Sequence, residues 1–117
     1  MESAEESQKK FGAKLAFDDY REMLAHPDID AVAVVLRVPA HYEPTMDALN
    51  AGKHVYTEWP LGRTTTEAQE MADLARSKGL HNMVGLQARA NPAILYAKDL
   101  VESGFVGEVM SLSLIHI

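Results

Sequence analysis

The chain has 117 residues, of which 47% are apolar and 24% charged, a composition typical of about one soluble globular domain. Its formal net charge is −6 and its pI is near 5.3, and without a basic stripe it does not suit a nucleic-acid partner. The absence of cysteine excludes disulfides, thiolate metal sites and thiol nucleophiles. The apolar run of residues 31–36 is too short to span a bilayer, and the acidic N-terminus does not resemble a signal peptide. We therefore expect a cytoplasmic protein with no membrane partner.

The first half of the chain predicts two helices on either side of one strand. Asp18 or Asp19 suits the N-cap of a short helix, which has to end before Pro27. Residues 31–36 are continuously apolar and rich in β-branched side chains, which predicts a strand buried on both faces. Pro44 in a first helical turn and Gly52 at a C-terminus predict a helix over residues 43–51.

The second half continues the alternation of strands and helices. Residues 54–57 and 80–86 predict two more strands, and residues 109–117 alternate loosely, as in a last strand. Thr64 and Glu67 match a capping box, which opens a helix that ends at Gly79. A further helix is predicted from its opening and closing residues and its apolar anchors, which are Asn91, Pro92, Gly104, Ile94, Leu95 and Val101.

Strands that alternate with helices through short connections predict parallel pairing with right-handed crossovers. The fold class expected is therefore α/β, a partial Rossmann-like doubly wound parallel sheet. Ligands bind such sheets outside the carboxyl ends of the strands. Those ends are residues 37–41 (RVPAH), 58–62 (EWPLG) and 87–91 (QARAN), and all three segments carry polar or aromatic side chains.

The order of four segments resembles the Gfo/Idh/MocA oxidoreductases over residues 3–111, namely DDYREMLAHPDIDAVAVV, HYEPTMDALNAGKHVYTEWPL, TTTEAQEMADLARSKG and MVGLQARANPAILYAKDLVESGFVGEV. AGKHV followed by E-x-P is similar to the family signature, which usually reads Glu-Lys-Pro. The V-x-x-H-Y-E, E-W and L-Q-x-R segments resemble most the branch of the fungal galactose-regulon repressor, a non-catalytic relative. The resemblance implies a nicotinamide-dinucleotide fold that takes NAD or NADP as its cofactor.

The resemblance also implies that the sequence covers only part of the family's length. It contains no G-x-G-x-x-G, so we expect the first strand and the Gly-rich turn to be missing. Residues 1–108 are expected to be the C-terminal part of the dinucleotide-binding domain, and residues 109–117 the start of a truncated second, α+β domain. Residues 14–17 match the family's short strand, and residues 31–36 would form an unpaired sheet edge. Such an edge promotes association, so we expect the isolated chain to be marginally stable or self-associating.

Seven cofactor-binding candidates follow from the resemblance: Arg37, His41, Glu58, Trp59, Pro60, Gln87 and Arg89. Glu58 matches a carboxylate that meets the cofactor ribose or nicotinamide region, and Pro60 follows a peptide bond that is often cis in the family. His41 matches a histidine near the nicotinamide, and Arg89 an arginine near the domain junction. A solvated strand-end glutamate, a solvent-facing helix histidine and an exposed arginine before a helix remain the alternatives. The other histidines lack metal-ligand spacing, so no metal site is predicted.

Trp59 replaces the lysine of the family signature, and its indole N–H can donate a hydrogen bond but cannot accept a proton. No catalytic residue is therefore assigned within the chain. Two functions remain open for the full-length parent. One is an oxidoreductase acting on a sugar, polyol or related substrate, a homo-oligomer whose proton-transfer group lies outside this chain. The other is a non-catalytic regulator that senses NAD(P). The 117 residues alone are expected to be inactive.

Overall fold

The structure is a computed structural model that describes residues 4–111. Its contacts divide the chain into two compact units, Met1–Gly85 and Leu86–Ile117. The domain boundary expected at residue 108 stays a prediction. Within the described part of the chain, no helix is long and apolar enough to cross a membrane.

Two helices precede the sheet. The helix α1 (Ala4–Phe11) was not expected from the sequence; it has acidic residues in its first turn and basic ones in its last, as the helix dipole favours. The helix α2 (Tyr20–Ala25) begins as predicted, because the Asp19 carboxylate accepts a hydrogen bond of 2.8 Å from the Arg21 backbone N–H. Residues 14–17, which match the family's short strand, pair with no neighbouring strand, as expected where that neighbour is missing, and they have no regular secondary structure.

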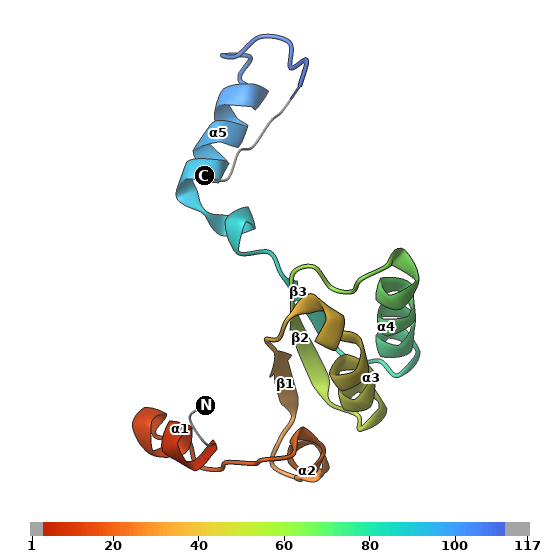
Figure 1. Cartoon of the computed structure of the whole chain (residues 1–117). Coiled ribbons are helices and arrows are strands. Elements are labelled where there is room, and N and C mark those ends of the chain that lie inside the picture. The colour runs from red at the N-terminus through yellow and green to blue at the C-terminus, as the bar shows by residue number, and fades with distance from the viewer. Residues whose placement is uncertain (1–3, 112–117) are drawn as a thin grey trace. The chain divides into compact units, whose positions relative to one another are not determined.

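The sheet has three parallel strands in the order β1-β2-β3, which are β1 (Ala31–Val34), β2 (His54–Glu58) and β3 (Asn82–Gly85). β2 is central, and Figure 1 shows it between the other two strands. The sheet confirms the predicted partial Rossmann-like fold. Among the described residues β1 pairs only with β2, so its other side is a sheet edge, as expected.

Two crossover helices lie on one face of the sheet (Figure 1): α3 (Tyr42–Asn50) joins β1 to β2, and α4 (Thr65–Ser77) joins β2 to β3. The Thr64 hydroxyl caps α4 by accepting a hydrogen bond of 3.1 Å from the Glu67 backbone N–H. The Glu67 carboxylate accepts a hydrogen bond from the backbone N–H of Arg63, and a backbone hydrogen bond from Thr64 contributes to the lowered pKa of Glu67, as the predicted capping box requires.

The hydrophobic core lies between the sheet and these helices. Its buried members are Leu24, Val32, Val34, Ala48, Leu49, Val55 and Ala75. The prediction that residues 31–36 are buried on both faces is wrong: Ala31 and Ala33 are exposed, and the strand ends at Val34. The reason is that α3 and α4 pack on the same face, so every second residue of β1 faces away from the core.

The second unit contains a single turn of 3-10 helix, η2 (Gln87–Ala90), followed by α5 (Pro92–Glu102). The Asn91 side chain caps α5 by accepting a hydrogen bond of 2.9 Å from the Ala93 backbone N–H, as its sequence predicts. The predicted apolar anchors Ile94, Leu95 and Val101 remain about half exposed. Residues 109–111 form no strand, and the rest of the last predicted strand lies outside the described residues.

Candidate functional site

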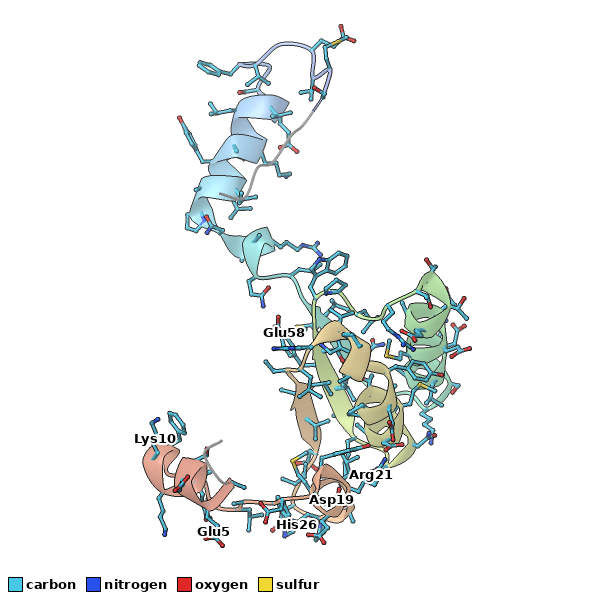
Figure 2. The ribbon with its side chains drawn as sticks, viewed as in Figure 1. Glu5, Lys10, Asp19, Arg21, His26 and Glu58 are labelled. Atoms are coloured by element: carbon cyan, nitrogen blue, oxygen red, sulfur yellow. The ribbon has the colours of Figure 1, made fainter. Side chains whose placement is uncertain are left out.

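The carboxyl ends of the three strands meet at one edge of the sheet because the strands are parallel. Glu58 is the last residue of β2 and lies beside Gly85, the last residue of β3. Figure 2 shows Glu58 at this end of the sheet, far from Asp19 and Arg21 of α2. The segments 37–41 and 59–62 follow directly from this edge, where doubly wound folds bind ligands.

Glu58 is partly buried, and its carboxylate accepts a hydrogen bond of 3.0 Å from the Tyr56 hydroxyl. This hydrogen bond, together with partial desolvation, raises the pKa of Tyr56 above its usual value. Tyr56 therefore stays protonated at neutral pH and donates to the carboxylate. The Glu58 side chain is oriented by a neighbour rather than merely solvated.

Trp59 follows Glu58 and is 64% exposed, the bond to Pro60 being cis, as the family resemblance suggested. Its indole is large and apolar, and Trp59 is among the exposed large hydrophobic residues. The arrangement places a flat aromatic surface immediately beyond the carboxyl end of the central strand. Such a surface can stack on a sugar or a nicotinamide ring.

His41 joins the two loops at this edge. It is fully buried, with Nδ1 at 2.9 Å from the Pro60 carbonyl oxygen and Nε2 at 2.8 Å from the Leu36 carbonyl oxygen. The alternative of a solvent-facing histidine is therefore wrong. Every tautomer of the ring carries an N–H, so at least one of these carbonyl oxygens accepts a hydrogen bond from it. The ring lies between the segment after β1 and the segment after β2.

The loop after β2 is also fixed at its far end. The Glu67 carboxylate accepts hydrogen bonds from the Arg63 backbone N–H at 2.8 Å and from Arg63 Nε at 2.9 Å. The hydrogen bonds with Arg63 lower the pKa of the Glu67 carboxyl. Gly62 packs closely here, because a Cβ at this position would lie 3.0 Å from the Cβ of Glu67. The loop that carries Trp59 is thus anchored at Pro60 and at Arg63.

No contact with this constellation is assigned to the remaining candidates. Arg37 is exposed and precedes the 3-10 turn η1 (Val38–Ala40). Gln87 and Arg89 are exposed residues of η2, in the second unit. The structure brings Glu58, Pro60 and His41 together, whereas the cofactor roles of all seven residues stay predictions.

The uncovered sheet face carries a shallow depression of about 550 Å³ over the amino-terminal halves of the strands. Ala31, Ala33, His54 and Met83 contribute to its lining. It lies away from the carboxyl edge and corresponds to bare sheet surface, so we do not assign the cofactor to it. Within residues 4–111, no three His, Asp or Glu side chains gather as a metal site would require.

Tyr56, whose hydroxyl contacts the candidate Glu58, was not predicted from the sequence. Two signals in the sequence point to it. It stands two positions before Glu58 in a predicted strand, so both side chains share a face. Gly85 lies inside the next predicted strand, where a glycine often marks a close approach by another group.

Comparison with known proteins agrees with this geometry. Residues 1–86 match a family model described as an oxidoreductase family with an NAD-binding Rossmann fold. Levoglucosan dehydrogenase of Pseudarthrobacter phenanthrenivorans is 34% identical over 110 residues, which are 94% of this chain and 28% of that protein. The galactose/lactose metabolism regulatory protein of Saccharomyces cerevisiae is 27% identical over 90% of this chain and 26% of its own length.

A solved structure is similar as well: scyllo-inositol dehydrogenase from Lactobacillus casei with bound NAD(H) and scyllo-inositol. It is 33% identical, superposes with a TM-score of 0.75, and is matched over 87% of this chain and 30% of its own. The chain thus spans less than a third of the length of these three relatives. With a family model that covers residues 1–86 of 117, the chain belongs to the Gfo/Idh/MocA oxidoreductase family with the NAD-binding Rossmann fold.

Proposed function

We propose that this chain forms the nicotinamide end of the cofactor site in an NAD(P)-dependent oxidoreductase that acts on a sugar, polyol or related substrate. The observation that carries the proposal is the placement of Glu58, Trp59 and Pro60 at the carboxyl end of the central strand. The family match covers this segment, and one solved relative holds NAD(H) together with an inositol.

The residues at this edge suit one half of the cofactor better than the other. A carboxylate such as that of Glu58 accepts hydrogen bonds from ribose hydroxyls, and the exposed Trp59 indole offers a face for a flat ring. Within the described residues, no glycine-rich turn opens a helix toward this edge, as a pyrophosphate would require. The choice between NAD and NADP is left to groups outside this constellation.

The bound cofactor would supply the hydride chemistry, while the residues described here bind and orient. Trp59 cannot take up or release a proton near neutral pH, so proton transfer would fall to a group outside this chain. We accordingly propose that the 117 residues alone bind the cofactor weakly and turn over no substrate. A homo-oligomeric, cytoplasmic parent protein remains part of this proposal.

A non-catalytic NAD(P)-sensing regulator is the second candidate. Two observations favour it: Trp59 stands where the family signature has lysine, and a galactose/lactose regulatory protein matches 90% of the chain. A protein of the relatives' full length that carries this segment separates the two functions. Turnover of an inositol or aldose with NAD supports the oxidoreductase, whereas tight cofactor binding without turnover of any of them supports the regulator.

The binding proposal can be tested on the chain itself. NADH, nicotinamide mononucleotide and AMP are titrated separately while ¹H–¹⁵N NMR signals and the fluorescence of Trp59, the single tryptophan, are followed. We expect NADH and nicotinamide mononucleotide to shift the signals of Glu58 and Trp59 alike, with millimolar affinity, and AMP to leave them unchanged.

Two matched glutamates provide the control. Glu58→Gln should weaken the response, whereas Glu70→Gln, which alters a glutamate on the outer surface of α4, should not. Shifts that follow AMP, or no shift at these residues up to about 10 mM ligand, would contradict the proposal.

A further inference from the structure

We infer that Tyr56 is a positioning residue for Glu58, and that Gly85 is a glycine because the Tyr56 side chain occupies the place where another side chain would begin. The inference rests on the proposed function in one respect, the assignment of Glu58 to the cofactor. It adds two residues to the site, one of them on a strand that carries none of the predicted contacts.

The strand geometry brings the three residues together. Tyr56 and Glu58 are two positions apart on β2, so their side chains leave the same face of the sheet. The register between β2 and β3 pairs Glu58 with Gly85 and Tyr56 with Met83. The Tyr56 ring points along the strand toward the carboxyl edge, because its hydroxyl reaches Glu58 Oε1 at 3.0 Å.

Gly85 makes room for this hydroxyl. A Cβ built at residue 85 would lie 2.3 Å from the Tyr56 hydroxyl oxygen, 2.9 Å from its Cζ and 3.0 Å from Glu58 Oε1. The first of these distances is impossible without movement of the ring. Since the backbone of Gly85 does not adopt the positive φ that favours glycine, the requirement is one of space and not of conformation.

The consequence is a carboxylate held before any ligand arrives. A glutamate has several rotatable bonds, and immobilising such a side chain costs binding free energy. The Tyr56 hydroxyl fixes Oε1 on the β3 side of Glu58, where the bare backbone of Gly85 leaves space. A ribose hydroxyl would then donate to an acceptor that is already oriented. In effective binding sites, the groups that contact the ligand are held in place in this way by hydrogen bonds from neighbouring residues.

The first experiment follows the tyrosine rings by ¹³C NMR from about pH 7 to 12. Tyr42 is the matched control, because its hydroxyl also donates to a glutamate, Glu70, and its pKa is raised for the same reason. We expect Glu58→Gln and Gly85→Ala to return the pKa of Tyr56 toward 10.0 and to leave that of Tyr42 raised. An unchanged Tyr56 titration in both variants would overturn the inference.

The second experiment measures NADH affinity of the chain. Tyr56→Phe removes the hydroxyl and keeps the ring, so it should weaken NADH binding about three- to tenfold, the value of one hydrogen bond. Tyr42→Phe should bind like the wild type. In the Glu58→Gln background, Tyr56→Phe should not weaken NADH binding further, because Tyr56 affects binding only by orienting Glu58.

The outcomes separate the inference from the proposed function. If NADH binds and Glu58→Gln weakens it while Tyr56→Phe does not, the inference is wrong and the proposed function stands. If the wild type shows no NADH response, the proposed function is contradicted, and the tyrosine titration still decides whether Tyr56 and Gly85 hold Glu58. Should Gly85→Ala fail to fold, Gly85→Ala/Tyr56→Val relieves the overlap: recovered folding supports the inference, and continued failure overturns it.

Discussion

The two faces of the sheet differ although the same three strands supply both. On one face Val32, Val34 and Val55 are buried against α3 and α4, and the buried Thr57 of β2 contacts the buried Thr45 of α3. On the other face Ala31, Ala33 and Met83 are exposed, and Tyr56 reaches along the surface to Glu58. The covered face supplies the packing that holds the strands, while the open face presents the groups assigned to the site.

This division explains why polar pairs behave differently in the two places. Thr45 and Thr57 are buried, and their hydroxyl oxygens lie 3.2 Å apart. If one hydroxyl is removed, the other loses this hydrogen-bond partner at a site where water does not replace it. The Tyr56 hydroxyl and Glu58 carboxylate lie where water can replace either group. Substitutions on the covered face should therefore affect folding, and those on the open face should affect binding.

The largest expected effect is the loss of a core side chain. Leu49 of α3 is 1% exposed, and Leu49→Ala should lower the free energy of unfolding by about 2–5 kcal/mol, enough to unfold a small domain. Met83→Ala removes a side chain of similar size from the open face, where it is 65% exposed, and should change stability by less than about 0.5 kcal/mol. Urea unfolding followed by circular dichroism measures both, and equal losses would mean that the second face is covered too.

A smaller effect is expected from the buried threonines. Thr57→Val keeps the side-chain shape but leaves the Thr45 hydroxyl without this partner, at a cost of about 1–3 kcal/mol. Thr45→Val/Thr57→Val removes both hydroxyls and should be less destabilising than the two single changes added together. Tyr56→Phe, the open-face comparison, should move the urea midpoint least. Additive threonine effects would show that the two hydroxyls do not depend on each other.

The elements followed from the sequence wherever local rules decide them. The β-branched run, the proline and glycine positions and the Thr64 and Asn91 caps correctly indicated three strands and the helices α2 to α5, but not α1. An apolar strand does not reveal how many of its faces have a neighbour, and so the burial of residues 31–36 was predicted wrongly. Which residues of the strand are buried depends on the face of the sheet against which the crossover helices pack, and this is determined only when the whole sheet has assembled.

The site divides in the same way. The resemblance to the family located Glu58, Trp59 and Pro60, and the structure places them at a strand end. The connection from His41 to the Leu36 and Pro60 carbonyls depends on two loops meeting in space. The contact of Tyr56 with Gly85 depends on the register of β2 and β3, which no single segment encodes. The residues at the strand end were predictable from the sequence, whereas the contacts that hold them in place were not.

A further effect, which is lost at alkaline pH, concerns the edge of the covered face, where α2 packs on α3. The Tyr20 hydroxyl donates a hydrogen bond of 2.7 Å to Asp47. Desolvation is the largest cause and this hydrogen bond the second largest that raise the pKa of Tyr20 from 10.0 to about 12. A pKa raised by folding stabilises the protein fully below the unfolded value and loses that contribution as the pH passes the folded value. Near pH 8 the free energy of unfolding of the wild type should therefore exceed that of Tyr20→Phe by about 0.5–1.5 kcal/mol. This difference should vanish between pH 10 and 12.

Urea midpoints of the two proteins, compared at each pH, cancel the titration of the tyrosines that both retain, Tyr42, Tyr56 and Tyr96. A stability difference that stays constant from pH 8 to 12 would mean that Tyr20 acts by packing alone. A difference that disappears on deprotonation assigns it to the hydrogen bond with Asp47. In that case the hydrogen bond between the protonated Tyr20 hydroxyl and Asp47 helps to hold α2 against α3. The same bond then contributes to the burial of Leu24, which is also on α2.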